Sequence, residues 1–284
     1  MLLQEAEDTL VDKAPDFALA CGFVPAPKRH AVRMLFCLYA HLLAIIHQTR
    51  DPMLGEIKLQ WWRDVFEGKR GEGEVRSHPF ASELLEILSH HHLPPHGLSD
   101  MVDAMTDFLF DDPPEDITAL EYAYGRIYSV LIRYASLILA DGQDSGPAGV
   151  AGPAGVAYGL TQALRNFALM RKGATLMIPS SLLQQAGLDA RSVCKQKDKA
   201  QIISLLQPLQ NLARQRLEEF KTDFVQLPVS LRPAFAVMGL VGPRLQRIEA
   251  EFQSPSFDPD RPFTDIGPLR QTFRLWQTAV WGRV

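Results

Sequence analysis

Six basic side chains at two places in the chain are candidates for binding an anion. Three stand at the start of a long apolar segment, and three stand near the end of another. Arginine binds the oxygens of a phosphate group in pairs, and it does so without a metal ion. Ordinary ion pairing at helix ends is the other interpretation, and the sequence leaves both open. The six residues are Lys28, Arg29, Arg33, Arg165, Arg171 and Lys172.

Histidines are the second group of side chains that could bind a ligand or a metal ion. His41 and His47 belong to the apolar stretch HLLAIIHQTRD at residues 41–51. A spacing of six puts their side chains on different sides of a helix, so we do not expect them to bind one metal ion together. We predict boundary or core positions, with ligand contact as the alternative. SHHHLPPH at 89–96 is interrupted by prolines and has no nearby cysteine or carboxylate to complete a metal site, so we predict a solvated helix end.

The composition limits the classes of protein that fit. The 284 residues are 46% apolar, and their net charge is −4 with both signs interspersed. This balance gives no indication of a nucleic-acid partner. The three cysteines, Cys21, Cys37 and Cys194, are odd in number and widely separated, which favours neither a disulfide framework nor a structural zinc site.

The location of the protein is predicted from the same sequence. The first twenty residues are acidic and show no secretory pattern, and no uninterrupted apolar run reaches the ~18 residues that span a bilayer. We therefore expect a cytoplasmic protein in a reducing compartment, with peripheral contact at the inner face of the membrane as an option.

Helical periodicity dominates the chain. Residues 31–46 are apolar on nearly every side, which is typical of a helix in the centre of a bundle. In the next helix, EIKLQWWRDVFEG, we predict that Ile57, Trp61, Val65 and Phe66 face the core. A capping box is predicted at Thr118 with Glu121. We predict one all-α domain over 1–284, with 1–20 loosely ordered and further helices over 79–90, 98–110, 117–139, 156–170, 196–225, 229–252 and 266–279.

A tandem hexapeptide, GPAGVA, occupies residues 146–151 and 152–157. It contains neither of the glycine patterns that bind phosphate groups. We therefore interpret it as a loop that leads into a helix.

Four segments together resemble the squalene/phytoene synthase family, in the order in which that family has them. They are KRHAVRMLFCLYAHLLAIIHQ, EIKLQWWRDVFEG, HPFASEL and LTQALRNFALMRKGATLMIPSSLLQQAGL, and the resemblance runs from about Pro27 to the last helix. It implies an isoprenoid synthase-like bundle of helices around a central cavity. Active members of the family join two prenyl diphosphates head to head.

The resemblance also shows where this chain departs from the family. Active members carry two Asp-rich motifs whose carboxylates hold magnesium against the diphosphate groups. In this chain the first motif falls on Leu43, Ala44 and His47, and the second falls on Asn166 and Met170. None of the five is a carboxylate, so the resemblance implies no catalytic or metal-binding residue and no cofactor.

We therefore expect a catalytically degenerate family member that acts by binding. The branch of the family formed by the mitochondrial complex I assembly factor also lacks the motifs, and this chain resembles it in HPFASELLEIL and FRLWQTAVW. The expected partner is a prenyl or lipid-like molecule, or a protein of respiratory complex assembly. The alternative is an active prenyltransferase, whose magnesium site would need Asp51, Glu56 and Asp64.

The C-terminal segment GPLRQTFRLWQTAVWGRV is predicted to be an amphipathic helix. Its apolar stripe is Leu269, Phe273, Trp276 and Val280, and arginines flank it. Docking of this stripe onto the bundle is the ordinary interpretation. Contact with a membrane surface is the other.

Overall fold

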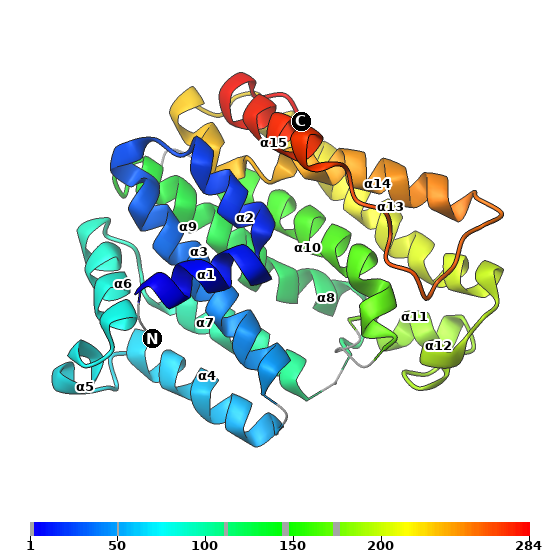
Figure 1. Ribbon diagram of the computed structural model, residues 1–284, viewed down its shortest axis with the longest axis horizontal. Helices are drawn as coiled ribbons and strands as arrows, with labels where there is room; N and C mark the ends of the chain where they lie inside the picture. The colour runs from blue at the N-terminus through cyan, green and yellow to red at the C-terminus, as the bar shows by residue number, and fades with distance from the viewer. Residues whose placement is uncertain (1–2, 50, 111–112, 144–147, 173–176) are drawn as a thin grey trace.

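The computed structural model describes residues 3–49, 51–110, 113–143, 148–172 and 177–284. The all-α prediction is confirmed, since the described residues contain helices and no strand. The three longest helices described are α3 (Ala26–Gln48), α10 (Ala148–Met170) and α13 (Lys199–Phe224), and α14 (Met238–Phe252) packs beside the last two. α10 packs along α13 and α14, and α4 to α7 lie at one end of the molecule while α11 and α12 lie at the other (Figure 1).

Shorter helices complete the bundle. The α-helices are α1 (Leu3–Lys13), α2 (Pro15–Ala20), α4 (Pro52–Phe66), α5 (Glu72–Arg76), α6 (Pro79–His90), α7 (His96–Thr106), α8 (Ile117–Tyr124), α9 (Val130–Leu139), α11 (Ser180–Gln185), α12 (Ser192–Lys195) and α15 (Pro268–Trp276). The 3₁₀ turns are η1 (Cys21–Phe23), η2 (Asp107–Leu109) and η4 (Val229–Phe235), and the π-helical turns are η3 (Gly125–Ser129) and η5 (Gln277–Trp281).

α3 lies in the core, as its apolar character predicts. Twelve of its residues are buried, from Ala31 to Ile45. By length and composition α3 is the one described helix that could cross a membrane, but 67% of its apolar window is buried inside the protein. That burial is typical of the core helix of a folded domain.

The N-terminal segment differs from the prediction of a loosely ordered 1–20. Residues 3–20 form α1 and α2, and Leu10 and Phe17 are buried. The ring of Phe17 lies 4.6 Å from that of Phe36 and 5.2 Å from that of Tyr158. The segment is ordered because it supplies an aromatic contact between α3 and α10.

The buried face of α4 agrees with the prediction only in part, because Val65 and Phe66 are buried as predicted but Trp61 is only half-buried. Ile57 is 64% exposed, whereas Leu59 and Trp62 are almost fully buried. Apolar residues stand on two sides of this helix, so periodicity alone could not choose between them. The face that carries Gly55 is the one that packs against the bundle. A Cβ at Gly55 would lie 2.8 Å from the side chain of Leu109, so only glycine allows this close contact.

The structure tests three local predictions, which concern the capping box, the histidine-rich stretch and the GPAGVA repeat. The start of α8 is capped by Asp116, whose carboxylate accepts a hydrogen bond from the Ala119 amide at 2.8 Å, so the predicted capping box is wrong. The histidine-rich stretch does end α6, but His91 is buried and only its neighbours are solvated. Of the GPAGVA repeat, residues 146–147 lie outside the described residues, and the remainder belongs to α10.

Candidate functional site

A cavity of about 640 Å³ lies between the start of the chain and the C-terminal half of α10. Its walls come from the end of α1, α2, the C-terminal half of α3, η2, α8, η3 and α10. Cavities of about 300–1,000 Å³ are the usual size for binding one small molecule.

Four tyrosines form one wall of this cavity: Tyr39, Tyr124, Tyr128 and Tyr158. The hydroxyl groups of Tyr39 and Tyr128 are 3.0 Å apart, and the rings of Tyr128 and Tyr158 are 5.3 Å apart. Burial raises the pKa of Tyr39, Tyr124 and Tyr158 well above the ordinary value, so the phenols stay neutral. Such a wall offers flat apolar faces together with a few hydrogen-bonding groups.

A glycine on α10 allows this wall to form. A Cβ at Gly159 would lie 2.7 Å from ring atoms of both Tyr124 and Tyr128. Only a residue without a side chain lets α10 approach the two rings this closely. The aromatic wall therefore depends on the helix packing at this one position.

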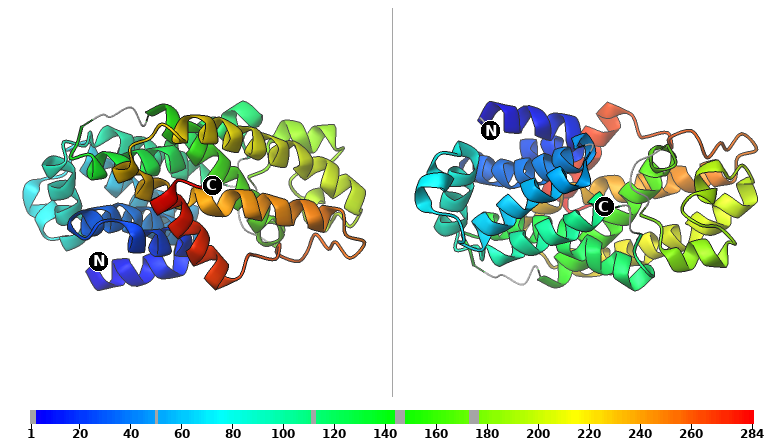
Figure 2. Two further views of the ribbon diagram at one scale, coloured as in Figure 1. Left: turned by 90° about the horizontal axis from the view of Figure 1, so that it is seen from above. Right: turned by 90° about the horizontal axis from the view of Figure 1, so that it is seen from below.

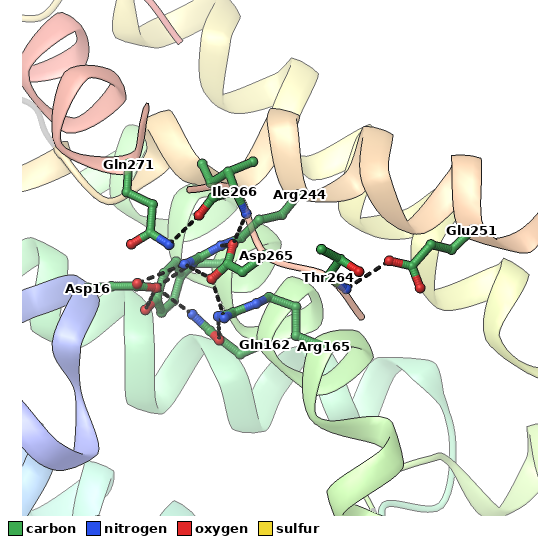
Figure 3. A network of polar contacts seen from close by, with 10 residues as sticks. Asp16, Gln162, Arg165, Arg244, Glu251, Thr264, Asp265, Ile266 and Gln271 are labelled. Carbon is green, nitrogen blue, oxygen red and sulfur yellow. Dashed lines mark hydrogen bonds and ion pairs between the residues drawn. The ribbon is translucent and has the colours of Figure 1, made fainter. Parts of the chain in front are cut away.

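A polar network connects three residues of the cavity lining, Asp16, Gln162 and Arg165, to Arg244 and Asp265 (Figure 3). Asp16 accepts hydrogen bonds from the Arg244 guanidinium (2.8 Å, Nη2 to Oδ1), from the Tyr158 hydroxyl (2.8 Å) and from the Gln162 amide (2.8 Å). Asp265 pairs with the same arginine and also with Arg165, at 2.5 Å from its Nη2. Burial alone would raise the pKa of Asp16, but the hydrogen bonds and the charge of Arg244 hold that pKa below its ordinary value.

The positions of the two motifs lie at this cavity. Leu43 and His47 on α3 and Asn166 and Met170 on α10 all line it, whereas Ala44 is buried and lies outside the lining. Four of the five positions that the resemblance implies therefore meet at one cavity. Burial lowers the pKa of His47, and the charge of Lys13 lowers it further, so this imidazole is neutral near pH 7.

These side chains do not suit a magnesium site. Leu43 and Met170 have no oxygen ligand, and Asn166 has one amide oxygen. Asp16 is the one carboxylate among the described lining residues, and Arg244 and its other partners already occupy it. Across the described part of the chain, no group of three histidine, cysteine or acidic side chains is placed to hold a metal ion.

Of the six basic candidates, Arg165 alone lines the cavity. Lys28 pairs with Asp141, Arg33 pairs with Glu7 at 3.4 Å and Arg171 pairs with Asp260 at 3.2 Å. The guanidinium of Arg29 donates to the carbonyl of Val24, and Lys172 is exposed. Ion pairs therefore occupy four of the six, since Arg165 also pairs with Asp265 at 2.5 Å. Lys13, which the sequence did not single out, joins Arg165 at the cavity.

The acidic residues required by the alternative are far apart. Asp51 caps α4 and accepts from the Met53 amide at 3.0 Å, whereas Asp64 pairs with Arg70 near the other end of the helix. Thirteen helical residues span about 20 Å, so the two carboxylates cannot bind one metal cluster. Glu56 lies between them and does not line the cavity.

His41 belongs to the packing of the bundle and not to the cavity. Its ring lies edge-on to those of Trp62 at 5.5 Å and Phe80 at 6.3 Å. Burial, and then the charge of His78, lowers the pKa of His41 to about 4. His41 is half-buried, which agrees with the boundary or core position that the sequence predicted.

Sequence reasoning missed Asp16 and the tyrosine wall. Asp16 is a single acidic residue in the apolar stretch PDFALACGFV, and an isolated acid there is a sign of a buried partner. Tyr124 and Tyr128 are four apart and share a helix face, which periodicity could have shown. The partner of Asp16 lies 228 residues away, and no local pattern identifies it.

Comparison with solved structures identifies the fold. Dehydrosqualene synthase in complex with ligand matches with a TM-score of 0.77 and 15% identity, over 97% of this chain and 94% of that one. Squalene synthase HpnC from Alicyclobacillus acidocaldarius matches with a TM-score of 0.72 and 12% identity, over 89% and 94%. YisP from Bacillus subtilis matches with a TM-score of 0.67 and 15% identity, over 96% and 94%. The fold is therefore that of the isoprenoid synthases, as expected.

The family follows from the sequence itself. The model of the squalene/phytoene synthase family matches residues 10–263, so the chain belongs to that family. No curated protein sequence matches it significantly.

Proposed function

We propose that this protein is a catalytically degenerate member of the squalene/phytoene synthase family that binds a prenyl or lipid-like molecule without a metal ion. One observation carries the proposal. The positions expected to hold magnesium face the cavity, but they carry Leu43, His47, Asn166 and Met170. Compared with active members of the family, this chain has a cavity at the motif positions but no carboxylate at them.

The lining suits a long, unsaturated hydrocarbon chain. The tyrosine rings and apolar side chains such as Leu43, Phe108 and Met177 would contact the chain, and its burial would supply most of the affinity. Lys13 and Arg165 line the cavity, and each already pairs with one carboxylate, Asp12 and Asp265 respectively. Because part of their positive charge is neutralised, a ligand with one anionic head group fits better than one with two diphosphates.

Two other functions remain as alternatives. The resemblance to the mitochondrial assembly factor supports a role in respiratory complex I assembly, in which a protein would be the partner. The fold and the volume of the cavity support an active head-to-head prenyltransferase. Magnesium would be its cofactor, and the described donors do not suit that ion.

Calorimetry with farnesyl diphosphate, with and without magnesium, separates these functions. We expect binding that does not depend on magnesium and no release of diphosphate. Magnesium-dependent binding with turnover would overturn the proposal in favour of the prenyltransferase. Absence of binding, both to farnesyl diphosphate and to farnesol, would favour the protein partner.

Two variants locate the binding. Leu43→Trp fills the cavity and should abolish binding, whereas Val225→Trp, at a position that is 75% exposed, should not change it. Leu43→Asp with His47→Asp restores two carboxylates one helical turn apart at the cavity. We expect this double variant to gain magnesium-dependent affinity for farnesyl diphosphate, because it supplies the missing oxygen ligands.

A further inference from the structure

The C-terminal helix presents an apolar stripe to solvent. Leu269 is 89% exposed, Phe273 49%, Val280 44% and Trp281 48%. α15 lies on the outside of the bundle, against α14 (Figure 2). The ordinary interpretation, in which this stripe docks onto the bundle, is therefore wrong.

A different face of the segment attaches it to the bundle. Leu275, Thr278 and Ala279 are buried. A Cβ at Gly239 of α14 would lie 2.5 Å from the Arg274 carbonyl oxygen, so the two helices are in close contact. The exposed stripe therefore belongs to a segment whose opposite face is tightly packed against the bundle.

The charged side chains of residues 266–284 are all basic. Residues 266–284 contain no acidic residue and carry Arg270, Arg274 and Arg283. None of these three arginines forms an ion pair with a described carboxylate, and the guanidinium of Arg283 lies over the Trp281 ring at 5.5 Å. The whole chain has a net charge of −4, whereas this segment by itself is positively charged.

We propose that α15 and η5 form a docking surface for a membrane with anionic lipids. Exposed leucine and aromatic side chains would enter the boundary between head groups and acyl chains, and the arginines beside them would contact the negative head groups. Tryptophan next to arginine is typical of that boundary. Charge complementarity selects this partner, and the proposal is independent of the ligand of the cavity.

Vesicle flotation of the full chain tests the proposal. The vesicles are phosphatidylcholine alone, or phosphatidylcholine mixed with phosphatidylglycerol, each at low and at raised salt. We expect binding to the mixed vesicles that weakens with salt. Arg270→Gln with Arg274→Gln should weaken it about 30-fold, since each basic residue near an anionic surface contributes about 1 kcal/mol, which is about a five-fold factor. Leu269→Ser should weaken it about ten-fold through lost apolar burial.

Matched variants make the result specific. Arg76→Gln with Arg261→Gln removes the same charge from two exposed side chains elsewhere, and Val225→Ser removes an exposed apolar group. Neither should change vesicle binding. Equal loss in the charge controls, or no binding by the unchanged protein, overturns the proposal. So does a dimer in solution that Leu269→Ser dissociates while vesicle binding is absent, because the stripe would then bind a second copy.

Discussion

Replacement of Arg244 by methionine should destabilise the protein strongly. Arg244 and Asp16 are 3% and 5% exposed, and the arginine supplies two of the hydrogen bonds to that carboxylate. Without it, Asp16 is a buried charge that lacks its main partner. Removal of one member of a buried ion pair costs about 3–5 kcal/mol. For a chain of this size that corresponds to a fall in Tm of about 10 °C.

The pH dependence identifies the cause. In the unchanged protein the pKa of Asp16 is lowered, so its stabilising contribution is present above the unfolded pKa and is lost as pH falls through the folded pKa. In Arg244→Met, the guanidinium no longer counteracts the effect of burial on Asp16, so the pKa of Asp16 should rise above its ordinary value. The penalty is then greatest near neutral pH and decreases as protonation neutralises Asp16. The gap in Tm between the two proteins should narrow from about pH 7 to about pH 4.5.

Thermal unfolding followed by circular dichroism measures both effects. Arg247→Met, on the same helix but without a described ion pair, is the control, and its free energy of unfolding should change by about 0.5 kcal/mol or less. Asp16→Asn added to Arg244→Met should recover part of the stability, because no buried charge is left. A double variant as unstable as Arg244→Met, or a gap in Tm that does not depend on pH, would refute the reasoning.

Two more predictions concern single packing positions. Gly159→Ala should lower the free energy of unfolding by about 1–3 kcal/mol, because the new methyl group overlaps the tyrosine rings, whereas Gly152→Ala on the same helix meets no neighbour within 4 Å and should raise it by about 0.5–1 kcal/mol. Urea titration measures both, and equal effects would contradict the close approach at α10. His41→Phe should make stability less sensitive to acid. Because the pKa of His41 is lowered to about 4, the free energy of unfolding should fall by up to about 3 kcal/mol as pH falls from about 6.5 to about 4. Parallel curves of Tm against pH for the two proteins would contradict this.

The sequence by itself determined the helical class, most helix positions and the family. Apolar periodicity and proline positions are local, and they fix α3, α6 and the α8 to α9 segment well. The resemblance also implied motif positions at Leu43, His47, Asn166 and Met170, and these four residues line one cavity. The predicted core face of α4 was correct for Val65 and Phe66 and wrong for Ile57, and the predicted stripe of the C-terminal helix is largely exposed.

The tertiary structure alone decided which polar groups meet and which apolar faces are covered. Asp16, Arg165, Arg244 and Asp265 come from segments far apart in the chain, and their pairing depends on how those segments pack. The same packing left the stripe of α15 exposed, since the buried Leu275 face was sufficient to dock the helix. Local patterns describe one helix at a time, whereas partners and exposure are properties of the assembled bundle.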